Sequence, residues 1–192
     1  MRHYSPIVKE AVALLQQGKV IIFPTDTLFG LAANASDENA VKRIYQLKKR
    51  PLSKGLPVMI PAKEFIHIIA DDLKDYALSL IEKYWPGPLT IVVRKKPLIL
   101  DFVTGNSPNV AIRIPHHPLD LDILSAFGGT LAVTSANVSG HSGADDFTAV
   151  STLFKDKVDL ILPGELTHRT PSTVVDCTGT TPVILRPGAI KI

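Results

Sequence analysis

Hydrophobic residues recur at two different periods along this chain, which predicts that helices and strands alternate. Several segments carry apolar residues three and four positions apart, the spacing that places them on one face of a helix. The first such segment follows Ser5-Pro6, a pair typical of a helix start, and ends at Gly18. Further helices are predicted from Ser36 to Leu47 and over Lys63–Ala70, Leu73–Tyr84, Pro118–Phe127 and Ala144–Phe154.

Short apolar runs rich in β-branched residues lie between these segments and predict strands. They cover Lys19–Phe23, Leu56–Ile60, Leu89–Val93, Val110–Ile114, Thr130–Val133, Val158–Leu162, Thr173–Asp176 and Val183–Leu185. Pro24 ends the first of them, and a loop is expected after it. Alternating elements predict an α/β fold, and the late strands without helices between them favour a mixed sheet. No repeat or low-complexity linker interrupts the pattern, so one domain over residues 1–192 is expected.

Composition is that of an ordinary globular protein, with 45% hydrophobic and 20% charged residues, and argues against a disordered chain. The net charge of +3 permits anionic partners without requiring them. A single cysteine, Cys177, excludes an intrachain disulfide or a multi-cysteine zinc site, and its apolar neighbours favour a buried side chain. No signal peptide and no run of about 20 apolar residues is present, so we expect a cytoplasmic protein without a membrane span.

Four cations gather on one short corner, where Pro51 interrupts the chain between Arg50 and Lys54. Lys48, Lys49 and Arg50 stand at the predicted end of a helix, where basic side chains also favour the helix dipole. The segment is therefore compatible with a solvated helix end or with a polyphosphate site. Gly55 follows Lys54 and has no side chain, so a ligand could approach the backbone there.

Two polar segments follow predicted strands. Thr134–Gly140 is dense in short hydroxyl and amide side chains, which suit either a phosphate pocket or a polar turn. Thr25 and Thr27 occupy alternate positions after the first strand, and Asp26 between them is a candidate turn residue. Strand ends in α/β sheets are common ligand sites, so the Thr25–Thr27 segment is also a candidate for ligand binding.

Arg113 stands inside an otherwise apolar predicted strand, and Arg186 directly follows another. An edge-strand arginine that reaches solvent would explain either one alone. A shared anionic ligand explains both together, because a guanidinium matches carboxylate and phosphate oxygens. The chain has no Walker-type GxxxxGK[ST] loop, no GxGxxG after a strand and no HExxH, so known dinucleotide and zinc-protease sites are not supported, and no metal-ligating residues are predicted.

Seven segments in one order resemble the YrdC/Sua5/TsaC family of threonylcarbamoyl-AMP synthases. They are Phe23-Pro24-Thr25-Asp26-Thr27-Leu28-Phe29-Gly30-Leu31, Leu47-Lys48-Lys49-Arg50-Pro51 with Lys54, Trp85-Pro86-Gly87-Pro88-Leu89-Thr90, Val110-Ala111-Ile112-Arg113-Ile114-Pro115, Ser135-Ala136-Asn137-Val138-Ser139-Gly140, Pro171-Ser172-Thr173-Val174-Val175-Asp176 and Leu185-Arg186-Pro187-Gly188. The resemblance implies a twisted open mixed sheet with flanking helices and a concave basic face. It also implies a nucleotidyltransferase that converts L-threonine, bicarbonate and ATP, with Mg²⁺, into threonylcarbamoyl-adenylate and pyrophosphate for the t6A modification of tRNA.

The same resemblance assigns roles to individual residues. Lys48 and Arg50, with Ser135 and Asn137, match the family's ATP-binding signatures, and Lys48 and Arg50 would be catalytic. The full ATP-binding set that it implies is Lys48, Arg50, Lys54, Asn109, Ser135, Asn137 and Arg186. The threonine-binding set is Thr27, Arg113 and Ser172, with Arg113 on the carboxylate. Arg50 is expected to be an exposed cation that contributes little to stability.

The chain differs from the family pattern at two positions, with Met59 in place of a frequent histidine and Gly143 in place of a serine of the longer branch. The resemblance implies the short TsaC type, which depends on partner proteins to pass the threonylcarbamoyl group to tRNA. An alternative is an RNA-binding or ribosome-associated protein that contacts the phosphates of tRNA or double-stranded RNA. The cations available for this role are Lys48, Lys49, Arg50, Lys54, Arg94, Lys95 and Lys96. The much longer carbamoyltransfer proteins that mature hydrogenase have zinc-finger-like cysteines, which this chain lacks.

Overall fold

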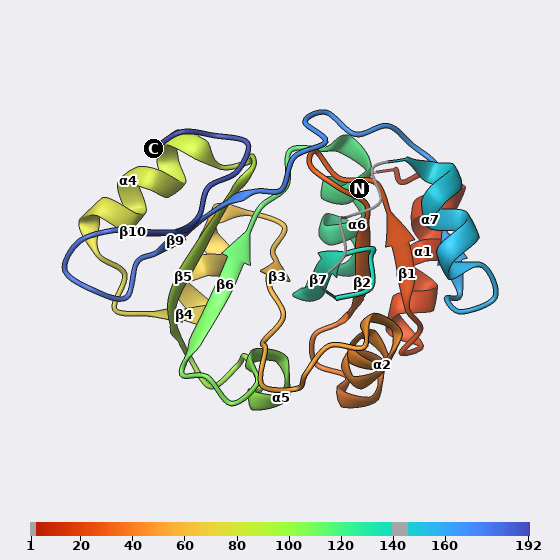
Figure 1. The fold of residues 1–192 in the computed structure, drawn as a ribbon, viewed down its shortest axis with the longest axis horizontal. Helices are drawn as coiled ribbons and strands as arrows, with labels where there is room; N and C mark the ends of the chain where they lie inside the picture. The colour runs from red at the N-terminus through yellow and green to blue at the C-terminus, as the bar shows by residue number, and fades with distance from the viewer. Residues whose placement is uncertain (1–2, 140–145) are drawn as a thin grey trace.

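The computed structural model describes residues 3–139 and 146–192, and the ten strands in this part of the chain form one open mixed sheet with helices on both sides (Figure 1). The strands are β1 (Ile21–Phe23), β2 (Gly30–Asn34), β3 (Val58–Met59), β4 (Ala70–Asp71), β5 (Leu89–Lys95), β6 (Asn109–Arg113), β7 (Leu131–Ser135), β8 (Leu160–Ile161), β9 (Thr173–Asp176) and β10 (Val183–Arg186). The helices are α1 (Pro6–Gln16), α2 (Glu38–Lys48), the 3₁₀ turn η1 (Lys63–Phe65), α3 (Ile66–Ile69), α4 (Asp75–Tyr84), α5 (Asp101–Thr104), α6 (Pro118–Phe127) and α7 (Phe147–Phe154).

The strand order β10-β9-β5-β6-β3-β7-β2-β1-β8, with β4 against β5, confirms the predicted mixed sheet. Strands β3 and β6, β5 and β9, and β1 and β8 pair in parallel, whereas the remaining neighbours are antiparallel. Because β3 is only two residues long, it joins β6 to β7 over a short stretch of sheet. The half containing β5 and β6 and the half containing β7, β2 and β1 lie on either side of it (Figure 1).

The helix ends follow the signals expected from the sequence. Asp37 caps α2, because its Oδ1 accepts hydrogen bonds from the backbone N–H groups of Asn39 and Ala40 at 2.9 and 3.0 Å. Gly18 follows α1 with φ of 72°, a left-handed conformation that glycine adopts without strain. Lys49 adopts the left-handed conformation directly after α2, so the chain turns sharply at the basic corner.

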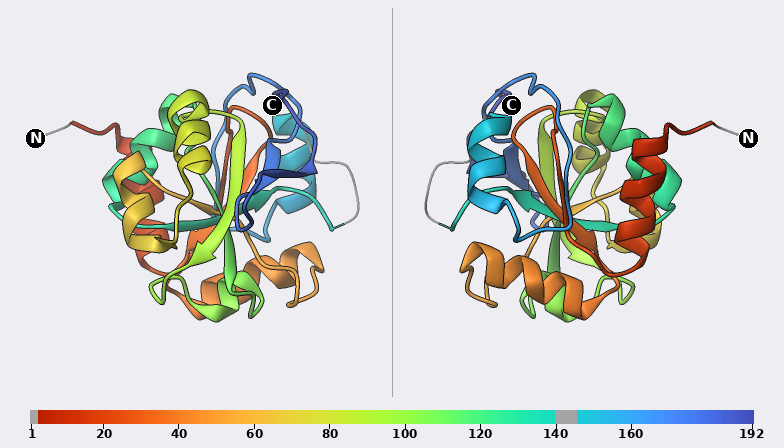
Figure 2. Two further views of the ribbon diagram at one scale, coloured as in Figure 1. Left: turned by 90° about the vertical axis from the view of Figure 1, so that its left-hand side faces the viewer. Right: turned by 90° about the vertical axis from the view of Figure 1, so that its right-hand side faces the viewer.

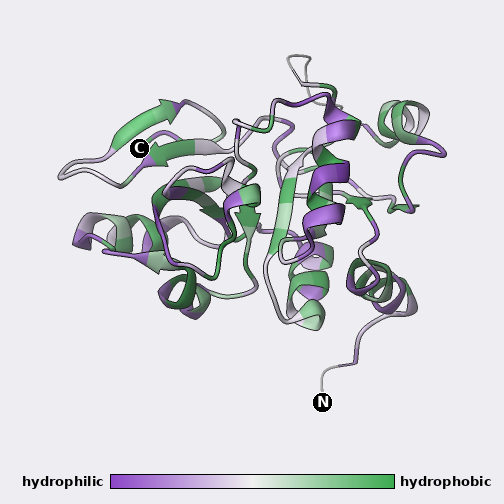
Figure 3. Cartoon of the chain, turned by 90° about the horizontal axis from the view of Figure 1, so that it is seen from below, coloured by the Kyte–Doolittle hydropathy of each residue, from purple (hydrophilic) through white to green (hydrophobic). Residues whose placement is uncertain are grey.

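Both faces of the sheet are covered around β1. Its side chains alternate, with Ile21 and Phe23 packed under α1 and α6 and Ile22 packed on the side of α2. Figure 2 shows α1, in red, and α6, in green, on the same side of the molecule. Figure 3 shows hydrophobic colour concentrated along the strands, whereas the helices carry both colours. A strand that is buried on both faces needs the continuous apolar run seen at residues 20–23.

The sequence pattern missed β2, where only a loop was expected after Pro24. Its residues Gly30–Asn34 include one glycine and two alanines, which have low strand propensity. The strand forms because β1 and β7 pair with it on both sides, an interaction between distant segments that local propensity cannot register. Helix α7 begins at Phe147, and the predicted start at Ala144, like Gly143 and Gly140, lies outside the described residues.

No helix within residues 3–139 and 146–192 has the length and apolar character needed to cross a membrane.

Candidate functional site

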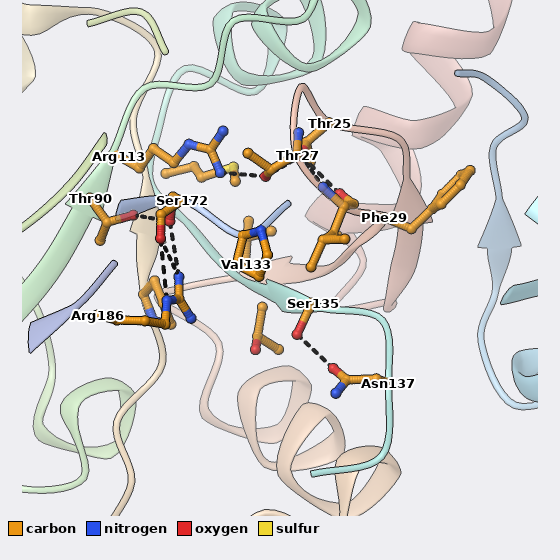
Figure 4. Close-up of a pocket in the computed structure, with 16 residues that line it drawn as sticks. Thr25, Thr27, Phe29, Thr90, Arg113, Val133, Ser135, Asn137, Ser172 and Arg186 are labelled. Atoms are coloured by element: carbon orange, nitrogen blue, oxygen red, sulfur yellow. Dashed lines mark hydrogen bonds between the residues drawn. The ribbon is translucent and has the colours of Figure 1, made fainter. Parts of the chain in front are cut away.

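A cavity of about 340 Å³ opens at the centre of the sheet (Figure 4). The β1–β2 loop, the segment before β9, and strands β3, β5, β6, β7 and β10 contribute to it. Its polar side chains include several that the sequence singled out, namely Thr27, Arg113, Ser135, Asn137, Ser172 and Arg186. The predicted threonine set and three members of the predicted ATP set therefore meet in a single space.

Thr25 shapes the loop that presents Thr27. Its Oγ1 accepts the backbone N–H groups of Thr27 and Leu28 at 3.0 and 3.2 Å and donates to the carbonyl oxygen of Leu28 at 2.8 Å. Thr25, rather than Asp26, is therefore the turn-forming side chain, which corrects the expectation from sequence. The turn leaves the Thr27 hydroxyl on the cavity wall and buries Asp26.

Arg113 is buried, with 5% of its surface exposed, and the surrounding groups fix its guanidinium. Nε donates to the carbonyl oxygen of Gly87 at 3.0 Å, Nη1 donates to Thr27 Oγ1 at 2.7 Å, and Nη2 pairs with Asp26 Oδ1. Strand β6 lies between β5 and β3, so an arginine reaching solvent from a sheet edge is excluded. Two of the five guanidinium N–H groups have no partner among the described residues, and the side chain lines the cavity.

Arg186 reaches the same cavity from β10. Its Nη2 donates to the carbonyl oxygen and Oγ of Ser172 at 2.8 and 3.2 Å, and Ser172 Oγ lies 2.8 Å from Thr90 Oγ1 (Figure 4). Burial lowers the pKa of Arg186, and the positive charge of Arg113 lowers it further. Two arginines that repel each other across one cavity create a field that favours an anionic ligand.

A second cavity of about 490 Å³ adjoins the first, sharing Pro57, Thr90, Ser172 and Arg186 with it. Arg50 and Asn109, both expected at the nucleotide, line this second cavity. Among its other lining residues are the apolar side chains of Leu56, Val92, Val110, Ala111, Val174 and Leu185. An arginine at one wall and an apolar surface nearby suit a ligand with an anionic part and a flat apolar part.

Arg50 is half-buried rather than exposed, which corrects the expectation from sequence. Its Nε donates to the carbonyl oxygen of Lys54 and its Nη2 to that of Gly55, both at 2.8 Å. Burial lowers the pKa of Arg50. The guanidinium therefore holds the loop after α2 while it faces the second cavity, and a substitution there will affect stability as well as binding.

Lys48 differs from the other cations because it is buried, with 2% of its surface exposed. Its Nζ donates to the carbonyl oxygens of Ser135 and Asn137 and to Asn137 Oδ1. Burial lowers the pKa of Lys48 to about 8, with a smaller contribution from the positive charge of Arg50. The sequence was compatible with a solvated helix end or a polyphosphate site here, and the structure places the ammonium beneath the residues that line the cavity.

Lys49 and Lys54 are exposed and lie in neither cavity wall. Gly55, where a ligand was expected to approach the backbone, lines the second cavity and also packs against another part of the chain. A Cβ at Gly55 would lie 2.6 Å from the carbonyl oxygen of Thr104, so the close approach is made by α5.

A buried acidic cluster, which the sequence reasoning missed, lies behind Arg113. Asp26 Oδ2 and both carboxylate oxygens of Asp120 are buried without a hydrogen-bond partner among the described residues. His117 Nδ1 lies 3.4 Å from Asp120 Oδ1. Burial raises the pKa of Asp120 to about 7, and the interaction with Asp120 raises that of His117. No sequence signal links Asp26 to Asp120, since 93 residues separate them and only the fold brings their charges together.

Cys177 is buried, as its apolar neighbours predicted. Burial raises the pKa of its thiol to about 11, so the thiol stays protonated and is a poor nucleophile.

The sequence of this chain matches a known protein family over most of its length. The model of the Sua5/YciO/YrdC family, which is described as "Telomere recombination", matches residues 13–188. The chain belongs to the Sua5/YciO/YrdC family. The matched range includes both cavities, the basic corner and the buried acidic cluster.

Individual members of the Sua5/YciO/YrdC family are similar over most of the chain. The threonylcarbamoyl-AMP synthase of Pyrococcus abyssi is 37% identical over 186 residues, which cover 96% of this chain and 55% of that protein. The threonylcarbamoyl-AMP synthase of Cellvibrio japonicus is 34% identical, over 90% of this chain and 92% of the relative. The crystal structure of P. abyssi Sua5 complexed with L-threonine superposes with a TM-score of 0.93 at 36% identity, covering 98% of this chain and 56% of that one.

The chain therefore spans about half the length of the Pyrococcus relative and nearly all of the Cellvibrio one. The α/β fold implied by the resemblance is confirmed, because the sheet and its helices match those of Sua5 closely.

Proposed function

We propose that this chain is an L-threonylcarbamoyladenylate synthase, a nucleotidyltransferase that uses L-threonine, bicarbonate and ATP. The convergence of Arg113 and Arg186 on one cavity carries the proposal, because it offers adjacent places for a carboxylate and a phosphate. The names of the Pyrococcus and Cellvibrio relatives and the threonine complex of P. abyssi Sua5 support it.

Threonine would bind at the Arg113 end. The two guanidinium N–H groups of Arg113 that remain available suit its carboxylate, and the hydroxyls of Thr27 and Ser172 would fix its orientation. Met59 lines this end of the cavity, so the wall beside the amino acid is apolar where many family members have histidine.

ATP would extend from the first cavity into the second. Arg186 lies between them, Ser135 and Asn137 supply short polar groups on one side, and Arg50 and Asn109 lie on the other. Lys54, which is exposed beside Arg50, would meet the phosphates from solvent. Magnesium would be held by phosphate oxygens and water and would neutralise their charge, since the described residues contain no group of three acidic, histidine or cysteine side chains placed for a metal.

The reaction needs two bonds to form. The amine nitrogen of threonine attacks the carbon of bicarbonate, giving a carbamate and water. A carbamate oxygen then attacks the α-phosphorus of ATP, and the bond to the β-phosphate oxygen breaks to release pyrophosphate. The cations and hydroxyls of the two cavities are fixed by their own hydrogen bonds before substrate arrives, so they can stabilise the developing charge with little rearrangement.

The product would serve t6A modification of tRNA in the cytoplasm, through partner proteins that transfer the threonylcarbamoyl group. Direct contact with tRNA or double-stranded RNA is the alternative role. Lys95 Nζ lies 2.8 Å from Asp101 Oδ1, and Lys96 Nζ donates to the carbonyl oxygen of His67 at 2.7 Å, so two of the cations proposed for RNA are already engaged.

Pyrophosphate release by the purified chain tests the proposed activity. With ATP, magnesium and bicarbonate present, adding L-threonine should raise the rate well above that of the threonine-free control. Release that does not depend on threonine, together with RNA binding that weakens steeply with salt, would instead favour the RNA-binding alternative.

Replacing Arg50 with alanine is expected to lower kcat/KM for ATP by about 10²–10³-fold, because a fixed cation at the phosphates is lost. The same change should lower the free energy of unfolding by about 1–3 kcal/mol, since the carbonyl oxygens of Lys54 and Gly55 lose their donor. Lys49→Ala, at the adjacent exposed lysine, is the matched control and should change neither quantity. Kinetics and urea denaturation measure the two effects, and an Arg50→Ala enzyme with normal kcat/KM would remove Arg50 from the site.

A further inference from the structure

The ammonium of Lys48 has no N–H group left for a ligand. It donates one hydrogen bond to the carbonyl oxygen of Ser135 and two, both at 2.8 Å, to the carbonyl oxygen and Oδ1 of Asn137. A lysine ammonium has three N–H groups, so all of them are used within the protein. The side chain is also buried, which separates it from solvent and from a bound ligand.

The main chain of Lys48 holds the same segment. Its carbonyl oxygen accepts the N–H of Ser139 at 2.8 Å. Residues 135–139, here called the serine turn, are thus tied to the end of α2 by four hydrogen bonds from one residue. Ser135 Oγ donates to Asn137 Oδ1 at 2.6 Å, so the Lys48 ammonium and the Ser135 hydroxyl meet at the same amide oxygen.

The serine turn supplies the polar end of the first cavity. Ser135 and Asn137 both line it, whereas Lys48 lies beneath them and lines neither cavity. If the ammonium moved to a phosphate, it would leave three oxygens of the serine turn without this donor. Ligand binding would then remove the hydrogen bonds that hold the serine turn, although the ligand needs Ser135 and Asn137 to stay in place.

We propose that Lys48 is a positioning residue that shapes the serine turn for the nucleotide, and that Arg50, Lys54 and Arg186 contact the phosphates in its place. The inference rests on the proposed function for the identity of the ligand, but the anchoring of the turn does not. Lysine suits this role better than arginine, because its compact ammonium donates in three directions, whereas a guanidinium donates in one plane.

Amide hydrogen exchange without substrate tests the anchoring directly. Lys48→Met keeps the length and apolar stem of the side chain but removes the ammonium. The amides of residues 136–139 should exchange faster in this variant, while those of the β5–β6 pair should be unchanged. Lys54→Met is the matched control, since it removes an exposed lysine from the same corner and should leave exchange as in the unmodified protein. Unchanged exchange in a folded Lys48→Met protein would overturn the proposal.

Binding and turnover then distinguish positioning from direct contact. Lys48→Met should lower kcat by about 100-fold, the effect of misplaced groups at a site, while the Kd for threonine stays unchanged. Its ATP affinity should retain the salt dependence of the unmodified protein, whereas Lys54→Met should reduce that dependence, because an exposed ionic contact is screened by salt.

Lys48→Arg is a second variant, and it keeps the positive charge. It allows the proposal to be tested even if the Lys48→Met protein fails to fold. A positioning role predicts that Lys48→Arg also exchanges faster over residues 136–139 and turns over slowly. A direct phosphate contact predicts near-normal ATP binding in Lys48→Arg, which would contradict the inference. A different outcome is that the Lys48 variants exchange faster, as expected, but the unmodified protein releases no pyrophosphate when threonine is added. That outcome would support the anchoring and reject the proposed function.

Discussion

Replacing Arg113 with methionine is expected to destabilise the folded protein by about 3–5 kcal/mol and to abolish threonine-dependent turnover. Stability is lost because Asp26, which is 1% exposed, would remain as a buried charge without its ion-pair partner Arg113. Turnover is lost because the Arg113 guanidinium, which lines the cavity, would no longer be there to bind the carboxylate of threonine. Urea denaturation and calorimetric titration of threonine measure the two effects separately.

The double variant Arg113→Met/Asp26→Asn separates these two effects. Removing both charges should recover most of the lost stability, because a buried ion pair can be replaced by neutral groups at little cost. Threonine binding should not recover. Arg94→Met, at an exposed arginine in β5, is the control and should change stability by less than about 1 kcal/mol. Recovery of threonine binding in the double variant would show that Arg113 acts only as a structural partner of Asp26.

The sequence singled out several polar residues that the fold brings to the two cavities, although it did not indicate how each one is held. Arg113 and Arg186 were recognisable as charges in or directly after apolar strands, and their meeting in one cavity follows from the sheet order, which places β9 and β10 beside β5 and β6. Lys48 and Ser135 are 87 positions apart in the sequence, and the resemblance placed them in one set. The structure shows that they are in contact, whereas their proposed role at ATP stays a prediction. Local patterns also gave α6 and β9 with their observed bounds.

Burial and long-range pairing account for most of what the sequence did not reveal. The sequence of a cationic helix end is the same whether its lysine is solvated or donates hydrogen bonds within the protein. Only the fold places hydrogen-bond acceptors around Lys48. Strand β2 is weak in propensity and forms because strands on both sides pair with it. Asp26 looked like a turn residue because its partner, Arg113, lies 87 positions away.

Asp120 provides the second large expected effect, a dependence of stability on pH. Its carboxyl group is fully buried in the first turn of α6, and burial raises its pKa from an ordinary value of 3.8 to about 7. A raised pKa means that the folded protein binds a proton more tightly than the unfolded chain does. The contribution of Asp120 to the free energy of unfolding is therefore greatest below about pH 4, and it falls as the pH rises toward 7. The raised pKa of His117 acts in the same direction, since the stability that it contributes is lost as the pH rises through its folded value.

Asp120→Asn should remove this dependence, because the amide has nearly the same shape and carries no charge at any pH. The change in pKa from 3.8 to about 7 corresponds to about 4 kcal/mol, so the variant should exceed the unmodified protein in stability by up to about that amount at pH 8. The difference should disappear near pH 4. Asp75→Asn, at an exposed aspartate in the first turn of α4, should show no such pH-dependent difference. Chemical denaturation across this pH range measures the effect, and a stability difference for Asp120→Asn that stays constant from pH 4 to pH 8 would mean that Asp120 is ionised in the folded protein, with its charge balanced by His117 and Arg113.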